Sequence, residues 1–262
     1  MSRLPVRPRK ELGQHFLVDE NLLGVIGRLA ELGPEDVVLE VGPGLGVLTG
    51  FLAERVAHVH AVEVDRNLES HLTARLGDAV NVTVTFGDAL TLDLDALRPQ
   101  PDKLVANLPY NVATPVVAES IDGLPSVRAW CVMVQREVAD RFFAAAGTKA
   151  YGGVSVLLRL TTQRTGFHPV SRTVFRPPPR VDSALVAFRR RGPLPEDFAD
   201  VKRVVVAAFG HRRKTLANSL ELGGVASRAV ATDALRRIGR APAVRAEELE
   251  PEEFARLADA LR

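Results

Sequence analysis

The chain has 262 residues, of which 46% are hydrophobic and 25% charged, with a net charge of +2 and a single cysteine. This length suits one large domain with a smaller appendage, and one thiol excludes an internal disulfide and a metal site built from several cysteines. No apolar stretch approaches the roughly 18 residues of a membrane span and no signal-type apolar segment follows the charged N-terminal residues, so we expect a cytoplasmic protein that does not bind membranes.

The first two thirds of the chain alternate between amphipathic segments and short apolar runs. A helix is predicted from Asp19 to about Leu32, and the apolar runs predict strands at 37–41, 58–62, 80–86, 103–106 and 130–134. Further helices are predicted up to Leu52 and over 65–76, 113–121 and 136–146. Runs at 155–161 and 182–188 predict two more strands near the sheet edge. This alternation predicts a doubly wound α/β sheet that binds ligands at the carboxyl ends of its strands.

The pattern changes after Arg191. Residues 192–195 (GPLP) predict a linker, and the remainder predicts helices over 196–209, 212–222, 228–239 and 251–261. We therefore predict three parts, which are a basic N-terminal arm (1–18), an α/β domain (19–191) and a small all-helical domain (192–262).

Acidic and basic residues are distributed unevenly. Residues 31–100 hold twelve acidic and four basic side chains, whereas residues 159–240 hold seventeen basic and six acidic ones. This split predicts a polyanionic partner that docks on the basic flanks. The candidate phosphate contacts are Arg9, Lys10, Arg212, Arg213 and Lys214. For any one of these side chains, a solvated surface is the simpler explanation.

A glycine-rich turn, Glu40–Gly46 (EVGPGLG), follows the first predicted strand. Its spacing departs from the dinucleotide fingerprint GxGxxG and matches the ExGxG form of S-adenosylmethionine enzymes. Glu63 ends the next strand, where a carboxylate can accept both hydroxyls of a ribose, and Asp88 follows the third, where it can accept from an adenine amino group. We predict that Gly42, Gly44, Glu63 and Asp88 bind S-adenosylmethionine. For the loop alone, a nicotinamide enzyme is the alternative.

The segment Asn107–Tyr110 (NLPY) follows the fourth predicted strand. The exocyclic amine of adenine is a poor nucleophile, because its lone pair is delocalised into the ring. The Asn107 side-chain oxygen and the Leu108 carbonyl can accept its two hydrogens and favour a pyramidal nitrogen that attacks a sulfonium methyl. Pro109 fixes the turn, and Tyr110 offers a face on which an extruded base can stack. A turn with a packing tyrosine is the competing explanation for this segment alone.

Taken together, these segments resemble the bacterial small-subunit (16S) ribosomal RNA adenine dimethyltransferases of the KsgA type. The resemblance runs nearly end to end and rests on six segments: 12–17 (LGQHFL), 40–46 (EVGPGLG), 107–111 (NLPYN), 134–138 (VQREV), 175–183 (FRPPPRVDS) and 212–220 (RRKTLANSL). It implies a Rossmann-like class I methyltransferase sheet with a small C-terminal all-helical domain that binds RNA.

The resemblance also implies a reaction and a set of site residues. The reaction is dimethylation of two adjacent adenosines near the 3′ end of 16S rRNA, with S-adenosylmethionine as cofactor. Motif matching adds His15, Leu17 and Asn107 to the cofactor site, with His15 standing where many relatives have Asn. It also implies that Phe175 faces the target base opposite Tyr110.

Two other functions remain alternatives. One is a methyltransferase of the macrolide-resistance type, which modifies one large-subunit adenine. The other is an assembly factor that binds immature small subunits and whose catalysis is secondary. The expected partner is 16S rRNA within the immature small subunit, the chain is expected to be a monomer, and no metal is expected because the six histidines lack metal-ligand spacing.

Overall fold

The structure is a computed structural model that describes residues 6–211 and 213–262, apart from the side chain of Lys10. Its contacts divide the chain into two compact units, each formed by two stretches of sequence. The first comprises Met1–Ala139 with Arg164–Arg190, and the second Asp140–Gln163 with Arg191–Arg262.

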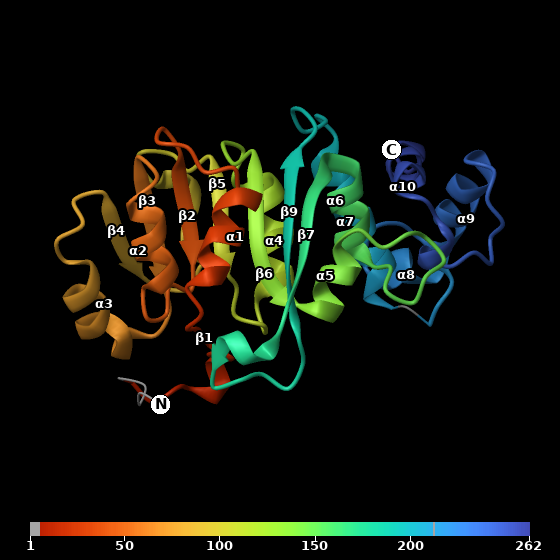
Figure 1. Ribbon diagram of the computed structural model, residues 1–262. Helices are drawn as coiled ribbons and strands as arrows, with labels where there is room; N and C mark the ends of the chain where they lie inside the picture. Colours follow the sequence, from red (N-terminus) through yellow and green to blue (C-terminus); the bar gives the residue numbers. More distant parts are fainter. Residues whose placement is uncertain (1–5, 212) are drawn as a thin grey trace. The chain divides into compact units, whose positions relative to one another are not determined.

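The first unit is built on a seven-stranded sheet with the order β4-β3-β2-β5-β6-β9-β7 (Figure 1). Its strands are β2 (Val37–Val41), β3 (His58–Glu63), β4 (Val82–Phe86), β5 (Lys103–Asn107), β6 (Ala129–Gln135), β7 (Thr162–Val170) and β9 (Ser183–Arg190). The five strands β4, β3, β2, β5 and β6 run parallel to one another, and β9 is antiparallel to β6. The predicted doubly wound, Rossmann-like class I methyltransferase sheet is confirmed.

Strand β2 lies between β3 and β5, so the chain winds away from it in both directions. In such sheets the loops that leave the two neighbouring strands part at this point and open a crevice at their carboxyl ends. The register places Val41 beside Val62. Gly42 continues this pairing, since its N–H donates to the Val62 carbonyl over 2.9 Å.

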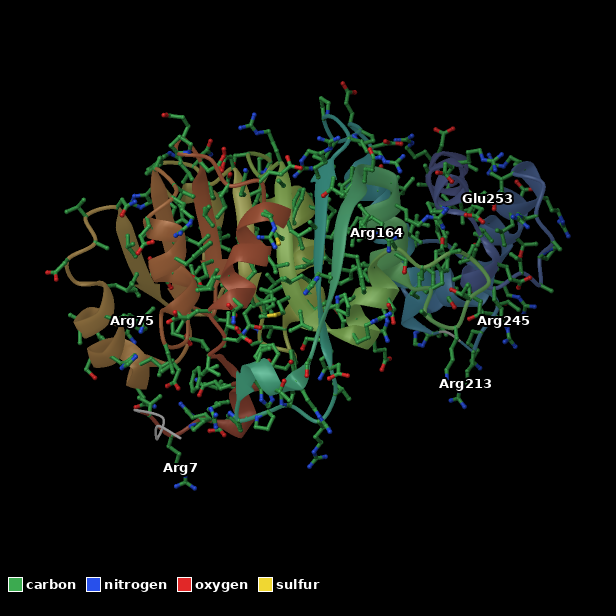
Figure 2. The ribbon with its side chains drawn as sticks, viewed as in Figure 1. Arg7, Arg75, Arg164, Arg213, Arg245 and Glu253 are labelled. Carbon is green, nitrogen blue, oxygen red and sulfur yellow. The ribbon has the colours of Figure 1, made fainter. Side chains whose placement is uncertain are left out.

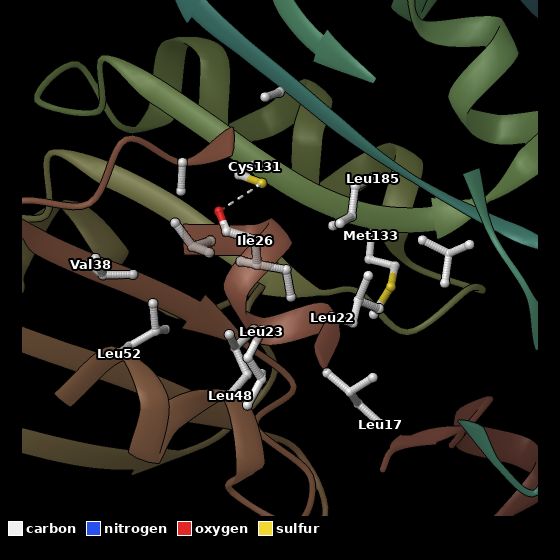
Figure 3. Packing of buried hydrophobic residues seen from close by; sticks show 14 of the residues in the cluster. Leu17, Leu22, Leu23, Ile26, Val38, Leu48, Leu52, Cys131, Met133 and Leu185 are labelled. Atoms are coloured by element: carbon white, nitrogen blue, oxygen red, sulfur yellow. Dashed lines mark hydrogen bonds between the residues drawn. The ribbon is translucent and has the colours of Figure 1, made fainter. Parts of the chain in front are cut away.

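Helices cover both faces of this sheet, because successive strand residues point to opposite sides. Cys131 and Met133 of β6 pack in the core cluster of α1 (Asn21–Leu29) and α2 (Val47–Ala53), which Figure 3 shows from close by. Trp130, which precedes Cys131 and therefore points to the opposite face, donates its indole N–H to Ser120 Oγ of α4 (Ala113–Gly123) over 2.9 Å. The helix α3 (Glu69–Leu76) precedes the edge strand β4.

A short second sheet joins the N-terminal segment to this unit. A 3-10 turn, η1 (Lys10–Leu12), leads into β1 (Phe16–Leu17), which pairs antiparallel with β8 (Phe175–Arg176). Leu17 lies opposite Phe175 in this pairing. Residues 175–176 come after β7, so this small sheet brings together parts of the chain about 160 residues apart.

The second unit is mainly helical. Its helices are α6 (Gly153–Thr161), α7 (Phe198–Gly210), α8 (Leu216–Leu222), α9 (Arg228–Arg237) and α10 (Pro251–Ala260), and α5 (Arg136–Phe142) crosses into it from the first unit. Phe254 and Tyr151 are fully buried in its core, where the Tyr151 hydroxyl donates to the Leu249 carbonyl over 2.8 Å. Arg240 and Glu253 form a two-pronged ion pair between the α9 end and α10.

The strand predicted at 155–161 is wrong, because these residues form α6. The helix buries every side chain from Val154 to Leu158. A helix that is buried on most sides shows a continuous apolar run without the 3.6-residue period, and such a run reads equally well as a buried strand. At the C-terminal end of α6, the hydroxyls of Thr161 and Thr162 donate to backbone carbonyls one turn earlier in the helix.

None of the helices in the described part of the chain is both long and apolar enough to cross a bilayer. No cluster of three or more His, Cys, Asp or Glu side chains is arranged there to hold a metal ion.

Candidate functional site

A cavity of the first unit opens at the carboxyl ends of β2, β3 and β5. It encloses about 660 Å³, mouth included, which is within the usual range for small-molecule sites. Nine of the predicted site residues line it: His15, Leu17, Gly42, Gly44, Glu63, Asn107, Leu108, Pro109 and Tyr110. Residues from four separate parts of the sequence therefore meet at the sheet's switch point.

The glycines of the loop are required by both conformation and space. Gly42, Gly44 and Gly46 all have φ between 56° and 78°, which side chains other than glycine rarely adopt. A Cβ on Gly42 would lie 3.0 Å from Pro109 Cδ, and one on Gly44 would lie 3.0 Å from Phe16 Cδ1. The loop therefore packs backbone-first against both the NLPY segment and the N-terminal segment.

Glu63 holds its carboxylate at the edge of the cavity. The side chain is buried, and its two oxygens accept backbone N–H groups, Oε2 from Gly44 over 3.1 Å and Oε1 from Asp65 over 2.9 Å. Burial raises the pKa of Glu63, although these hydrogen bonds oppose the shift. The carboxylate is thus fixed in direction and has little competing solvent, which suits it to accept a pair of ligand hydroxyls.

Glu40 also lines the cavity, and we did not predict it as a site residue although it begins the glycine loop. It is buried in β2, and its Oε2 has no hydrogen-bond partner among the described residues. Burial, with a contribution from the nearby Glu63 charge, raises the pKa of Glu40 to about 8. A buried carboxyl oxygen without a partner at a cavity wall is a ready acceptor for a ligand or water donor.

Asp88 lies in a second cavity of about 590 Å³ that adjoins the first. The two cavities share Gly42, Glu63 and Pro109. Asp88 is exposed, and its Oδ1 caps the following turn by accepting the Leu90 N–H over 2.9 Å. An elongated ligand can therefore extend from Asn107 past Glu63 to Asp88, in the order that a methionine, a ribose and an adenine would require.

The NLPY segment is held by backbone and side-chain bonds. The Leu108 N–H donates to the Met133 carbonyl over 3.1 Å, which continues the pairing of β5 with β6. Asn107 donates its side-chain N–H to the His15 carbonyl over 3.2 Å. This bond uses the amide nitrogen of Asn107, so the side-chain oxygen remains available to accept a hydrogen bond from a ligand.

Tyr110 is half-buried and lines the cavity. Its hydroxyl lies 2.7 Å from Ser183 Oγ, and its ring stacks on His15 with centroids 5.3 Å apart. His15 Nδ1 in turn lies 2.7 Å from the Pro177 carbonyl oxygen. The predicted catalytic segment, the N-terminal segment and the 175–183 segment therefore meet at Tyr110.

Phe175 is not at the surface of this site. Its side chain is 1% exposed and belongs to the core cluster that contains Leu17 and Leu185. The ring has no exposed face in this conformation, so we assign Phe175 a packing role. The predicted stacking of Phe175 on a target base requires an exposed ring face, which Phe175 lacks in this structure.

The predicted RNA contacts are divided between the two units. In the first unit, Arg9 forms ion pairs with Glu11 and Asp65, and the side chain of Lys10 lies outside the described residues. In the second unit, Arg213 and Lys214 are exposed in the turn before α8, and Figure 2 shows Arg213 directed away from its helices. Arg212 lies outside the described residues.

Comparison with known proteins gives consistent matches along the chain. A family model described as ribosomal RNA adenine dimethylase matches residues 6–262. Proteins named ribosomal RNA small subunit methyltransferase A are similar to this chain. The one from Rubrobacter xylanophilus is 48% identical over 96% of this chain and 94% of its own length. The one from Kineococcus radiotolerans is 47% identical over 98% of this chain and 87% of its own length.

Solved structures show the same fold. A dimethyladenosine transferase from Plasmodium falciparum superposes with a TM-score of 0.73 at 24% identity, covering 93% of this chain and 96% of its own. The 23S rRNA methyltransferase ErmE superposes with a TM-score of 0.64 at 29% identity, covering 94% of this chain and 99% of its own.

Proposed function

The chain belongs to the ribosomal RNA adenine dimethylase family, and we propose that the cavity at β2, β3 and β5 is where it dimethylates adenosines of small-subunit rRNA. It is an S-adenosylmethionine-dependent methyltransferase that converts the exocyclic amino group of 16S rRNA adenosines to the dimethylamine. One observation carries the assignment of the site. The Asn107–Tyr110 segment and the glycine loop line the same cavity at the sheet's switch point.

The residues fit the cofactor in shape and charge. Glu63 presents a fixed carboxylate toward the middle of the two adjoining cavities, and Asp88 lies in the outer one. S-adenosylmethionine carries a positive sulfonium, which a wall containing the Glu63 carboxylate favours. We assign the ribose hydroxyls to Glu63, the adenine amine to Asp88, and the methionine end to the backbone beside Gly42 and Gly44.

Asn107 and Leu108 carry the chemistry in this proposal. The Asn107 side-chain oxygen and the Leu108 carbonyl each accept one hydrogen of the target amine, which localises the nitrogen lone pair. The cofactor supplies an activated methyl group. The nitrogen lone pair that Asn107 and Leu108 localise would attack that methyl group, and the amine would lose one proton to water after transfer. A second transfer, to a monomethylated amine whose one remaining hydrogen engages only one of the two acceptors, gives the dimethylated base. No strong general base is needed, since the proton leaves after transfer.

Tyr110 acts on the base rather than on the methyl group. Its ring lies at the mouth of the cavity with its hydroxyl fixed on Ser183. A base extruded from its stack can rest on such a ring, with a gain of about 1–3 kcal/mol. Because stacking is tolerant of sequence, this contact would serve both adjacent adenosines.

We infer that the substrate is the immature small subunit, that the chain acts as a monomer in the cytoplasm, and that the exposed Arg213 and Lys214 contact RNA phosphates. The distribution of charge supports the last point, because residues 159–240 hold most of the unbalanced basic side chains. Assembly of the subunit and its methylation can be two roles of the same binding event. A catalytically inactive variant that still supports subunit maturation would show the first role separately.

The large-subunit alternative is less well supported. The ErmE structure is 29% identical to this chain, whereas relatives named for the small subunit are up to 48% identical. The deciding experiment is transfer of labelled methyl groups to unmethylated small and large subunits, followed by nucleotide mapping. We expect two adjacent dimethyladenosines near the 3′ end of 16S rRNA and no label in large subunits. Label confined to one large-subunit adenine would overturn the proposal.

A further inference from the structure

One wall of the cavity comes from the N-terminal segment, far in sequence from the strands that form the floor. Residues 12–17 all line the cavity, together with the loops that follow β2, β3 and β5. The segment has little regular structure, since η1 and β1 contain only three and two residues. Its position therefore depends on a few specific contacts.

Gln14 makes the contact that crosses to the β3 side. Its side-chain N–H donates to Asp65 Oδ2 over 2.8 Å, and its side-chain oxygen accepts the Arg9 backbone N–H over 2.8 Å. Both ends of the amide are therefore used, one within the N-terminal segment and the other across 51 positions of sequence. Arg9 adds a longer contact of 3.4 Å to Asp65 Oδ1.

Asp65 is in turn joined to the proposed ribose acceptor. It is 2% exposed, its backbone N–H donates to Glu63 Oε1 over 2.9 Å, and its side chain caps the next turn through the Asn67 N–H over 3.1 Å. Burial acts to raise the pKa of Asp65, but the hydrogen bonds from Gln14 and Asn67 and the Arg9 charge outweigh it and the pKa is lowered. The group is a carboxylate at neutral pH and a strong acceptor for the Gln14 amide.

We propose that Gln14 is a positioning residue for the cofactor: through Asp65 it ties the N-terminal wall of the cavity to the Glu63 loop. The inference rests on the proposed function, in which this cavity takes S-adenosylmethionine. Gln14 acts through Asp65 and not on the reacting atoms. Its loss leaves the catalytic groups of Asn107 and Leu108 unchanged but lets the wall move away from the ligand, so the effect falls on binding.

The direct test is the dissociation constant of S-adenosylmethionine, measured by calorimetry on the full chain. We expect Gln14→Ala to weaken binding roughly tenfold, the effect of losing a hydrogen bond to a charged group. The melting temperature without ligand should stay close to that of the parent, and the maximal methylation rate at saturating cofactor should change much less than the affinity. Gln100→Ala, which removes an exposed amide elsewhere in the same unit, should match the parent in all three measurements.

Gln14→Glu gives a signature that a merely structural role would not. It places a second carboxylate against Asp65, and one of the two must then be protonated for the contact to form. Affinity should therefore be poor at pH 8 and recover toward the parental value as the pH falls to about 5.5, while the parent shows no such recovery. Asn67→Ala is the matched control, because it removes the side-chain N–H that donates to Asp65 Oδ1 over 2.9 Å and does not touch the N-terminal wall.

Each outcome decides between the two proposals. A Gln14→Ala protein that binds S-adenosylmethionine with the parental dissociation constant overturns the positioning role of Gln14 and leaves the cofactor assignment intact. An equal loss in Asn67→Ala also overturns it, because the effect would then belong to Asp65 alone. A parent that does not bind S-adenosylmethionine at all overturns the proposed function instead.

Discussion

The Tyr110 hydroxyl lies 2.7 Å from Ser183 Oγ, which joins the NLPY segment after β5 to the first residue of β9. Burial raises the pKa of Tyr110, so the phenol stays protonated at neutral pH and keeps this hydrogen bond. Ser183 is buried, and the bond therefore fixes the ring from inside the protein rather than from solvent. The stacking surface offered to a base is thus set by two distant parts of the chain.

This relationship predicts a graded response at Tyr110. Tyr110→Ala removes the ring and should weaken binding of unmethylated subunits by about 1–3 kcal/mol. Tyr110→Phe keeps the ring and loses only one neutral hydrogen bond, to Ser183, so most of the activity should remain. Ser183→Ala should give a similar small loss, and the two small losses should not add. Additive effects in the double variant would show that the hydroxyls do not act together.

The buried carboxyl of Glu40 predicts a pH dependence of stability. Its pKa in the folded protein is about 8, above the ordinary value of about 4.3 in an unfolded chain. The folded state therefore binds more protons between these values, and stability falls as the pH rises through this window. Glu40→Gln removes this contribution, so its melting temperature without ligand should decline less than that of the parent between pH 5 and 8. Parallel curves for the two proteins would contradict the assignment.

Phe175 tests packing against base stacking. Phe175→Ala should destabilise the fold by about 3–5 kcal/mol, because it empties a fully buried site. Phe175→Leu keeps most of the buried volume, and we expect it to fold and to methylate subunits at nearly the parental rate. A folded Phe175→Leu protein that has lost affinity for RNA would instead show that the ring stacks on the target.

The basic residues before α8 predict a salt effect. Replacing Arg212, Arg213 and Lys214 together by Ala should weaken subunit binding, and the dependence of affinity on salt should flatten because fewer counterions are released. The affinity for S-adenosylmethionine should not change. Equal salt slopes for the variant and the parent would show that this cluster does not contact phosphate.

Sequence patterns predicted the sheet well, for a physical reason. Buried parallel strands are short apolar runs bounded by polar turns, and the runs at 37–41 and 103–106 match β2 and β5 to within a residue. The glycine loop and the NLPY segment could be predicted as site segments from the sequence because each directly follows such a strand. At 155–161 the same apolar character led to the wrong prediction of a strand, because the helix α6 is buried on most sides and its sequence is a continuous apolar run.

Contacts between distant segments could not be predicted in the same way. The Gln14–Asp65 bond joins residues 51 positions apart, and no local pattern in the sequence links the two. The burial of Phe175 depends on its pairing with Leu17 across β1 and β8, which are too short for a strand signal. The unpartnered oxygen of Glu40 likewise becomes apparent only when the neighbouring side chains are in place.

In the proposed mechanism, the role of Asn107 is to accept a hydrogen of the target amine within the cavity at β2, β3 and β5. Its most direct test is the rate of methyl transfer to unmethylated small subunits by Asn107→Ala, at saturating S-adenosylmethionine. By analogy with the loss of one preorganised polar group, we expect a rate lower by roughly 10² to 10³, with the melting temperature retained and only a modest loss of cofactor affinity. A folded Asn107→Ala protein that methylates at the parental rate would show that the segment is only a turn and would contradict the mechanism.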